Sequence, residues 1–375
     1  MASYFIIRGP CRLEWGSRVD VEVNGGRPDG TSLVVPTGRS YLVRVEGGSI
    51  EGNCSLHPVS SEVYESYRSA SSKASEYGRR ILIVGPSDTG KSTLASFTVN
   101  MGGGSLLTVD LGQNELYAPG FEALLLEPGF YVPGSVRGEV RRCFVGSFTP
   151  SRAPLEYLGC AGRLASHAND RLVVDTDGWV SRWEGLLSKA SLAAVVGADV
   201  VVGVGLDRID IEALEASTGL PVLSLPPLAR GVTKSRDERR THRDRLIAKR
   251  LQGSRMYSVS VDDLIVIGLP VFHGKPLDRD GLEALGVRGS LYAETHGGTL
   301  VIVSRYPPPR QLGATWLKPG WERGLLAAVD CGEGVQEVAL IDSINYRQRR
   351  IKLLSPCMPK MLWVGRVRVS IDSYV

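Results

Sequence analysis

The sequence lacks an uninterrupted apolar run long enough to cross a membrane. Its longest apolar stretch, from Leu192 to Val204, is interrupted by Gly197 and Asp199, whereas a membrane-spanning helix needs about 20 consecutive apolar residues. The first fifteen residues, MASYFIIRGPCRLEW, have too short an apolar run and the wrong flanks for a secretory signal. We therefore expect an intracellular chain, cytoplasmic or nuclear, with no membrane partner.

Cysteine is scarce and scattered. No two cysteines form a CxxC pair, and no histidine lies at metal-binding spacing from them. Because disulfides are uncommon inside cells, we expect reduced or buried thiols. This expectation covers all six cysteines: Cys11, Cys54, Cys143, Cys160, Cys331 and Cys357.

Excess charge of one sign is also small, at a net +4 for 375 residues. Hydrophobic residues at 43% and charged residues at 22% are close to globular averages, which excludes wholesale disorder and a fibrous repeat. The length favours two or three domains. The positive charge is concentrated between Lys234 and Arg250, where eight Lys or Arg face three Asp or Glu.

Changes in hydrophobic pattern divide the chain into three predicted domains. Residues 1–77 alternate short apolar and polar runs and predict a β-rich domain, which ends in a connector or polar helix rich in Ser and charge. In residues 78–253, strand-like runs such as ILIVG, SLLTVD and RLVVD alternate with helix-length segments. This pattern predicts an α/β domain with a mostly parallel, doubly wound sheet. Residues 254–375 return to short β-like runs and predict a second β-rich domain.

A phosphate-binding loop opens the central domain. The pattern G-x-x-x-x-G-K-S follows an apolar strand and precedes a helix-forming stretch. Glycines let backbone N–H groups curl around the phosphates, the lysine reaches the transferring phosphate, and the serine hydroxyl holds Mg²⁺. The predicted ATP-binding residues are Gly85, Pro86, Ser87, Asp88, Thr89, Gly90, Lys91, Ser92 and Thr93.

Asp110 ends the next predicted strand, in SLLTVDLGQ. The carboxyl ends of parallel strands line the ligand crevice of an open α/β sheet. Asp110 is therefore a candidate Mg²⁺ ligand or base, with Gln113 one short turn away. The alternative for an aspartate in this position is a turn or helix-capping role.

Two further segments have a functional and a structural interpretation. Trp179, in DTDGWV, lies at the rim of the predicted crevice, where it either packs in the core or stacks on a base. The basic segment at 231–253 is either a solvated, salt-bridged helix or a mobile lid whose arginines close over the γ-phosphate.

Taken together and in this order, these segments resemble the polynucleotide 5′-hydroxyl kinases. The eukaryotic members of that family act in pre-mRNA 3′-end cleavage, tRNA splicing and pre-rRNA processing, and it has archaeal relatives. The matching segments are GPSDTGKST, VDLGQNELYAPG, FVGSFTPSRAPLEYL, VVDTDGWV and GVTKSRDERRTHRDRLIAKRLQG. Of these, the D-x-G-Q motif with its following Pro-Gly is far more specific than the phosphate loop.

The resemblance implies ATP and Mg²⁺ as cofactors and a nucleic acid with a 5′-hydroxyl end as acceptor, RNA before DNA. It implies that Asp110 orients or deprotonates the hydroxyl and shares the Mg²⁺ shell with Ser92. It makes Arg239 and Arg243 the lid arginines, which act in catalysis with Lys91 and Asp110. The implied substrate-binding residues are Gln113, Thr176, Gly178, Trp179 and Lys234.

The chain departs from the family pattern at three positions. Thr108 stands where many members have an additional Asp. The segment VVDTDGWV is similar to the family's T-x-G-W clasp, which holds the nucleotides at the RNA 5′ end, and Asp175 replaces an Asn that is common at the start of this clasp. Lys234 replaces the first basic residue of the lid, an arginine, whose bidentate phosphate contact lysine cannot make. Two alternatives to a polynucleotide kinase stay open. One is an ATP-binding, catalytically weak assembly factor of an RNA-processing complex, and the other is a small-molecule kinase or regulatory NTPase. Protein partners are not predicted.

Overall fold

The computed structural model describes residues 2–227, 235–332 and 334–370. It divides into two compact units, of which the first comprises residues 1–145 and 149–243 and the second comprises residues 146–148 and 244–375. Among the described residues, no helix has both the length and the hydrophobicity of a membrane span. The cytoplasmic or nuclear location stays a prediction.

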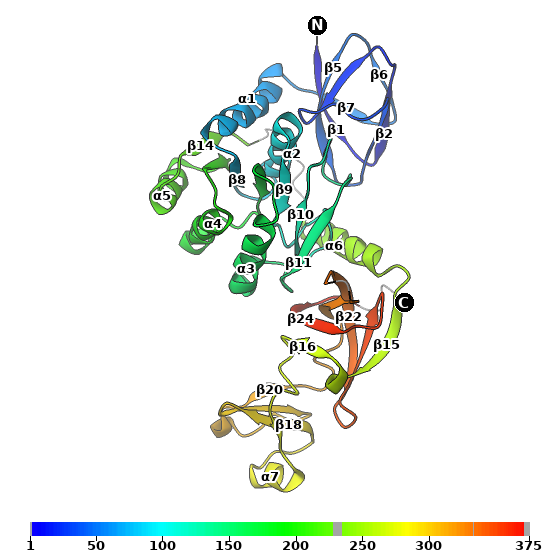
Figure 1. Ribbon diagram of the computed structural model, residues 1–375, viewed down its shortest axis with the longest axis vertical. Coiled ribbons are helices and arrows are strands. Elements are labelled where there is room, and N and C mark those ends of the chain that lie inside the picture. Colours follow the sequence, from blue (N-terminus) through cyan, green and yellow to red (C-terminus); the bar gives the residue numbers. More distant parts are fainter. Residues whose placement is uncertain (1, 228–234, 333, 371–375) are drawn as a thin grey trace. The chain divides into compact units, whose positions relative to one another are not determined.

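The first unit begins with two small antiparallel sheets (Figure 1). One has the strand order β3-β5-β1-β7 and the other β4-β2-β6. Alternating residues of these strands, such as Val21 and Val23 or Val43 and Val45, are buried between the sheets. The bounds are β1 Ser3–Arg8, β2 Cys11–Trp15, β3 Asp20–Val23, β4 Ser32–Val35, β5 Ser40–Glu46, β6 Ile50–Gly52 and β7 Ser55–Pro58.

The Ser-rich connector forms helix α1 (Ser61–Tyr77), as one of the two alternatives predicted. Its buried residues recur at helical spacing and include Tyr64 and Tyr67, whose rings contact Phe97 of helix α2 (Lys91–Gly102). The side chain of Asn100 in α2 also donates to the backbone carbonyl of Asn24. These contacts explain why residues 1–77, expected as a separate domain, belong to the same compact unit as the phosphate-binding loop.

The central sheet has seven strands among the described residues, in the order β11-β10-β9-β12-β8-β13-β14. Strands β9, β12, β8, β13 and β14 are parallel, which confirms the mostly parallel α/β fold. Strands β10 and β11 are added antiparallel at one edge. The bounds are β8 Arg80–Val84, β9 Ser105–Thr108, β10 Phe121–Leu125, β11 Val140–Phe144, β12 Leu172–Asp175, β13 Val200–Val204 and β14 Val222–Leu225.

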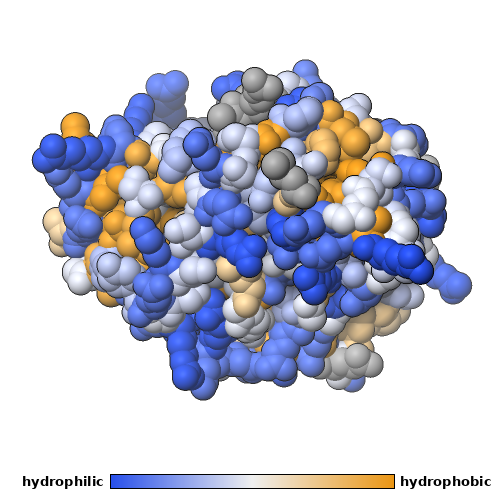
Figure 2. Space-filling model, turned by 90° about the horizontal axis from the view of Figure 1, so that it is seen from above, coloured by the Kyte–Doolittle hydropathy of each residue, from blue (hydrophilic) through white to orange (hydrophobic). Residues whose placement is uncertain are grey.

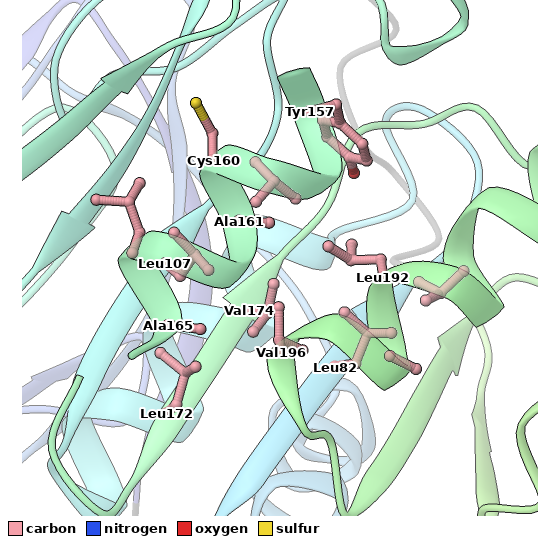
Figure 3. Close-up of a cluster of buried hydrophobic side chains, with 14 of the residues drawn as sticks. Leu82, Leu107, Tyr157, Cys160, Ala161, Ala165, Leu172, Val174, Leu192 and Val196 are labelled. Atoms are coloured by element: carbon pink, nitrogen blue, oxygen red, sulfur yellow. The ribbon is translucent and has the colours of Figure 1, made fainter. Parts of the chain in front are cut away.

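Helices cover both faces of this sheet (Figure 1). Helices α1 and α2 pack on one face, and α3 (Pro154–Ala165), α4 (Arg182–Val196) and α5 (Arg208–Thr218) pack on the other. Figure 3 shows Ala161 of α3 and Leu192 of α4 beside Leu107 and Val174 of the sheet. Because these strands are buried on both faces, they read as continuous apolar runs in the sequence.

The second unit is β-rich, as expected from the sequence. Its larger sheet has the order β15-β23-β22-β21-β24-β16 and its smaller sheet β17-β18-β19-β20. Helix α6 (Arg236–Leu251) leads into it, so the compact units divide within α6 and not at residue 253. The remaining bounds are β15 Arg255–Ser260, β16 Ile265–Ile267, β17 Lys275–Pro276, α7 Arg279–Ala284, β18 Ser290–His296, β19 Thr299–Ser304, β20 Thr315–Leu317, β21 Leu325–Asp330, β22 Gln336–Asn345, β23 Arg350–Ser355 and β24 Met361–Arg368, with short 3-10 turns at Pro150–Arg152, Val261–Asp263 and Arg310–Leu312.

The prediction of reduced thiols is wrong, because all six cysteines are paired in disulfides. The pairs are Cys11–Cys54, Cys143–Cys160 and Cys331–Cys357, with sequence separations of 43, 17 and 26 residues. The fold brings together cysteines that are far apart in sequence, including Cys143 of β11 and Cys160 of helix α3, so the absence of CxxC pairs was not informative. On the face in Figure 2, hydrophobic side chains form separate patches between hydrophilic ones, and most large apolar side chains are buried.

Candidate active site

The predicted phosphate loop connects β8 to α2 in the first unit. Gly90 has a φ of 101°, and a Cβ at Gly85 would lie 2.1 Å from the carbonyl oxygen of Val204. Both positions therefore require glycine. Asp88 also adopts a positive φ, of 63°. The loop thus turns tightly and delivers Lys91 and Ser92 at the N-terminus of α2, where backbone N–H groups bind anions.

Lys91 is buried below this loop, with 6% of its surface exposed. Its Nζ donates to the carbonyl oxygen of Pro86 at 2.6 Å. Burial lowers the pKa of the Lys91 ammonium, and the negative charges of Asp175 and Asp110 oppose this shift. Lys91 is therefore a desolvated cation whose interaction with a phosphate would be strong.

Ser92 is hydrogen-bonded to Asp175, which sequence reasoning had treated only as a departure from the family pattern. The Ser92 hydroxyl donates to Asp175 Oδ2 at 2.7 Å. Asp175 Oδ1 is buried and has no hydrogen-bond partner among the described residues. Burial raises the pKa of Asp175 to about 6, while the Ser92 hydrogen bond acts in the opposite direction. The signal in the sequence was an Asp that ends a strand beside the P-loop strand.

Asp110 lies in the turn after β9, and its position fits both a role in the turn and a role as a Mg²⁺ ligand or base. Its Oδ1 accepts the backbone N–H groups of Gly112 at 2.9 Å and Gln113 at 3.0 Å, so it fixes the turn. Burial and the charge of Asp177 raise the pKa of Asp110. Asp110, Gln113 and Thr108 line the same pocket as Lys91.

The clasp segment is held against both the sheet and the phosphate loop. The Thr176 hydroxyl donates to the Ile83 carbonyl at 2.8 Å, so in this structure its partner is the sheet. A Cβ at Gly178 would lie 2.1 Å from Ser87 Oγ and 2.6 Å from Ser87 N. The clasp therefore approaches the phosphate loop so closely that only glycine fits.

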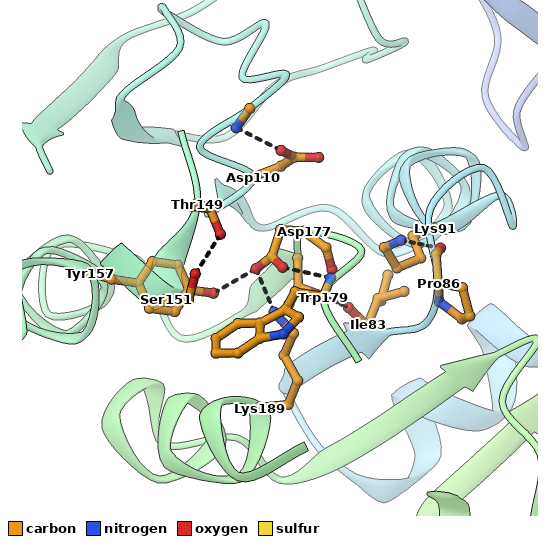
Figure 4. A network of polar contacts seen from close by, with 12 residues as sticks. Ile83, Pro86, Lys91, Asp110, Thr149, Ser151, Tyr157, Asp177, Trp179 and Lys189 are labelled. Atoms are coloured by element: carbon orange, nitrogen blue, oxygen red, sulfur yellow. Dashed lines mark hydrogen bonds and ion pairs between the residues drawn. The ribbon is translucent and has the colours of Figure 1, made fainter. Parts of the chain in front are cut away.

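Asp177, which the sequence did not single out, anchors the half-buried Trp179. Its Oδ1 accepts the backbone N–H of Trp179 at 2.8 Å. Its Oδ2 accepts the Tyr157 hydroxyl at 3.2 Å and forms an ion pair with the fully buried Lys189 (Figure 4). Glu122 is also fully buried, and its side-chain oxygens have no hydrogen-bond partner among the described residues.

The basic segment forms helix α6, and one of its arginines contacts the phosphate loop. Arg239 Nη2 lies 2.6 Å from Asp88 Oδ2. Arg243 lies one turn further along α6 and is half-buried. Lys234 and the first residues of the predicted lid, 231–234, lie outside the described residues.

Helix α6 also approaches the N-terminal sheets through an ion-pair cluster that sequence reasoning missed. His242 Nε2 lies 2.8 Å from Glu115 Oε1, and the same carboxylate pairs with Arg39. Arg39 precedes β5 and lines the pocket. It could not be found from the sequence, because no motif links residue 39 to the phosphate loop.

These elements converge on one pocket of the first unit. The phosphate loop, the ends of β9 and β12, the clasp and the start of β5 all contribute to its wall. Its lining residues are Ile6, Gly38, Arg39, Ser40, Tyr41, Leu42, Ser87, Asp88, Gly90, Lys91, Ser92, Thr93, Thr108, Asp110, Gln113, Pro133, Asp175, Thr176 and Gly178. A buried lysine, carboxylates at strand ends and a helix N-terminus define a P-loop nucleotide-binding protein.

Comparison with known proteins shows which proteins this chain is similar to. Residues 85–253 match the family model described as the P-loop of mRNA cleavage and polyadenylation factor CLP1. The chain is 26% identical over 315 residues to a polyribonucleotide 5′-hydroxyl-kinase of Thermococcus kodakarensis, a match that covers 77% of this chain and 88% of the relative. The chain is therefore similar over most of its length to polynucleotide 5′-hydroxyl kinases, the class of protein that its motifs predicted.

Other relatives and one solved structure are also similar to this chain. A polyribonucleotide 5′-hydroxyl-kinase of Methanocaldococcus jannaschii is 23% identical over 323 residues, which cover 79% of this chain and 89% of the relative. Human Clp1 is 31% identical over 217 residues, covering 51% and 49% of the two chains. The solved structure of wild-type Clp1p with Pcf11p has a TM-score of 0.58 at 12% identity and matches 98% of each chain, which establishes a common fold.

Proposed function

We propose that this protein is an ATP-dependent polynucleotide kinase that transfers the γ-phosphate of ATP to the 5′-hydroxyl of RNA. The observation that carries the proposal is the convergence of Lys91, Ser92, Asp110 and Asp175 on one pocket bordered by the clasp. Relatives that align over most of this chain are named polyribonucleotide 5′-hydroxyl-kinases.

The phosphate loop would hold the triphosphate of ATP. Backbone N–H groups of residues 85–93 would surround the β- and γ-phosphates. Lys91 Nζ, which now donates to the Pro86 carbonyl, would exchange that oxygen for phosphate oxygens. The exchange is favourable because a buried ammonium gains more from a charged acceptor than from a carbonyl.

The residues around Ser92 fit a magnesium ion. The Ser92 hydroxyl and the Asp175 carboxylate already touch, and Asp175 Oδ1 is buried without a hydrogen-bond partner among the residues described. Asp110 supplies a third oxygen-bearing side chain in the same pocket. Magnesium binds proteins through one or two carboxylates together with substrate phosphates. When bound, Mg²⁺ neutralises phosphate charge that develops during transfer.

Asp110 and the clasp would position the acceptor. The 5′-oxygen forms a bond to the γ-phosphorus as the bond from that phosphorus to the bridging oxygen of ADP breaks, and Asp110 accepts the proton. Trp179 would stack on the first bases, with Gln113, Thr176 and Gly178 beside them. Such transfers have a loose transition state, so positioning counts for more than a strong base.

The lid arginines would complete the charge neutralisation. Arg239 is paired with Asp88 at the edge of the phosphate loop, and it would shift from this carboxylate to the γ-phosphate when ATP binds. Arg243, one turn along α6, and Lys234 would act with it. Arginine suits this role because its planar fork matches phosphate oxygens.

Site variants test the proposal. We expect Lys91→Ala to abolish labelling of a 5′-hydroxyl oligonucleotide by γ-labelled ATP with an unchanged circular dichroism spectrum. Arg243→Ala should lower kcat more than it weakens ATP binding, because its contact forms mainly in the transition state. Undiminished labelling by the Lys91 variant would contradict the proposal.

Two other outcomes would favour the alternative functions. Stimulation of ATP turnover by a metabolite, and not by RNA ends, would favour a small-molecule kinase. ATP binding without any transfer would favour an assembly factor.

A further inference from the structure

One end of the smaller sheet in the second unit carries cationic and aromatic side chains from three strands. Ser290, which begins β18, pairs with Ser304, which ends β19. Strand β20 runs parallel to β19, with Leu317 opposite Val303. The residues that flank these three strand ends therefore meet at one end of the sheet.

Direct contacts connect these flanking residues. The backbone N–H of Arg305 donates to the carbonyl of Gly289 at 3.1 Å, and a Cβ at Gly289 would lie 3.2 Å from the Tyr306 ring. The Trp316 indole N–H donates to the Ser304 carbonyl at 3.1 Å. The ammonium of Lys318 lies 5.3 Å from the centre of the Trp316 ring. We call Arg288, Arg305, Tyr306, Trp316 and Lys318 the β18–β20 surface.

The cations of this surface are available to a ligand. Arg288, Arg305 and Lys318 are exposed, and none of them makes an ion pair within the part of the chain that the structure describes. The 27 residues from Thr295 to Trp321 contain no Asp or Glu. The local charge is therefore positive and uncompensated.

The aromatic side chains add a second kind of contact. Tyr306 is 57% exposed, although burial of an aromatic ring is favourable. Trp316 is half-buried, and its indole N–H is already bonded, which fixes the ring beside Lys318. Exposed rings next to unpaired cations are the means by which proteins bind single-stranded nucleic acids, because rings stack on any base and cations contact phosphates.

We propose that the β18–β20 surface binds single-stranded nucleic acid. This site belongs to the second unit and involves none of the residues assigned above to ATP, Mg²⁺ or the 5′ end. The proposal does not rest on phosphoryl transfer, because nucleic-acid binding can be measured without ATP. An acidic protein is the competing ligand, and it would use the cations without the rings.

The test measures binding of a fluorescent, 5′-phosphorylated oligouridine to the full-length protein by anisotropy, in the absence of ATP. Tyr306→Ala should weaken binding roughly 5- to 150-fold, the loss typical of one stacked base. Tyr306→Phe keeps the ring and should bind like the original protein. Arg305→Ala should reduce the slope of log affinity against log salt by about 0.7, the value for one contact to a single strand.

The matched control is Arg347→Ala, at an exposed arginine in the turn between β22 and β23 of the same unit. It should leave affinity unchanged. Equal affinity of Tyr306→Ala and Arg347→Ala would overturn the proposal, as would binding of a duplex as tightly as the single strand. Weaker oligouridine binding in Arg305→Ala, with unchanged binding in Tyr306→Ala, would show that the surface uses its cations without its rings. That result would favour the acidic protein over the nucleic acid. Kinase activity on a 5′-hydroxyl dinucleotide, measured separately, reports only on the pocket of the first unit.

Discussion

At the scale of single residues, Asp175 changes how the pocket is understood. The sequence indicated only added negative charge beside a polyanion. In the structure, Asp175 accepts a hydrogen bond from Ser92 and has a second, unpartnered buried oxygen. The position of Asp110 at a strand end could be predicted, whereas the pairing of Asp175 with Ser92 depends on the parallel register of β12 and β8.

The raised pKa of Asp175 leads us to expect that magnesium affinity depends on pH. Its pKa is raised to about 6, and Mg²⁺ binds the ionised carboxylate. Protonation below about pH 6 therefore competes with the metal, and affinity should fall roughly tenfold per pH unit. In Asp175→Asn, Mg²⁺ affinity should be weaker at pH 8 and should decline less on acidification, because Asp110 is then the carboxylate that still titrates. Isothermal titration of Mg²⁺ into the nucleotide complex at several pH values measures it, and identical pH profiles would contradict the prediction.

The raised pKa of Glu122 leads us to expect that the stability of the fold depends on pH. This expectation does not depend on the proposed kinase activity. Burial raises its pKa well above the usual 4.5, with a smaller contribution from Asp177. In the unfolded chain Glu122 ionises near its ordinary pKa, so the folded protein loses stability as pH rises from there toward the folded pKa. This loss is at most about 1.4 kcal/mol per pH unit.

Glu122→Gln removes the titration while keeping the shape of the side chain. The variant should gain stability relative to the original protein as pH rises above about 4.5. Urea unfolding at pH 5 and pH 8 measures the difference. A difference between the two proteins that does not change with pH would contradict this account.

At the scale of elements, the approach of the clasp to the phosphate loop links nucleotide and acceptor. Gly178→Ala places a Cβ 2.1 Å from Ser87 Oγ. Because backbone of the loop must move, we expect KM for ATP to rise by an amount equivalent to about 1–3 kcal/mol. Gly159→Ala is the matched control, since no atom lies within 4 Å of a Cβ there. Equal kinetics for the two variants would show that the contact is not needed.

The buried ion pair of Asp177 and Lys189 fixes the clasp from below. Removal of one partner leaves an uncompensated buried charge, so Lys189→Met should destabilise the fold by about 3–5 kcal/mol. The double variant Asp177→Asn, Lys189→Met leaves no charge and should recover most of this loss, since Asn still accepts the Trp179 N–H. Chemical unfolding of Lys189→Met, Asp177→Asn and the double variant measures the coupling, and additive losses would contradict it.

The elements themselves were largely predictable from the sequence. The runs at 81–85, 105–110, 171–175, 199–204 and 220–225 correspond to the five parallel strands, because strands buried on both faces must be apolar throughout. The antiparallel strands β10 and β11 were missed. Strand β11 carries Arg141 and Arg142 and so gives no continuous apolar signal.

At the scale of the whole molecule, the disulfides are the largest departure from expectation. They close loops in both units, between residues 43, 17 and 26 positions apart. A cross-link restricts the unfolded chain, and chain entropy gives about 4 kcal/mol for the longest of these loops and about 3 kcal/mol for the shortest. No local pattern encodes these pairings, because they depend on how distant parts of the chain meet in the fold.

Reduction should therefore lower thermal stability substantially. We expect a lower melting temperature in dithiothreitol. The melting temperature should fall more in the double variant that replaces Cys11 and Cys54 by Ser than in the double variant that replaces Cys143 and Cys160 by Ser. Thiol titration of the unfolded protein before and after reduction counts the bonds. Six titratable thiols before reduction would contradict the pairing.

A labelling experiment distinguishes a 5′-hydroxyl acceptor from every other fate of the γ-phosphate. The protein is incubated with γ-labelled ATP, Mg²⁺ and two matched single-stranded RNAs, one with a 5′-hydroxyl and one with a 5′-phosphate. We expect label at the 5′ end of the hydroxyl RNA alone, and no label with Lys91→Ala. Equal labelling of both RNAs, or no label in either despite ATP binding, would contradict the proposed 5′-hydroxyl kinase activity.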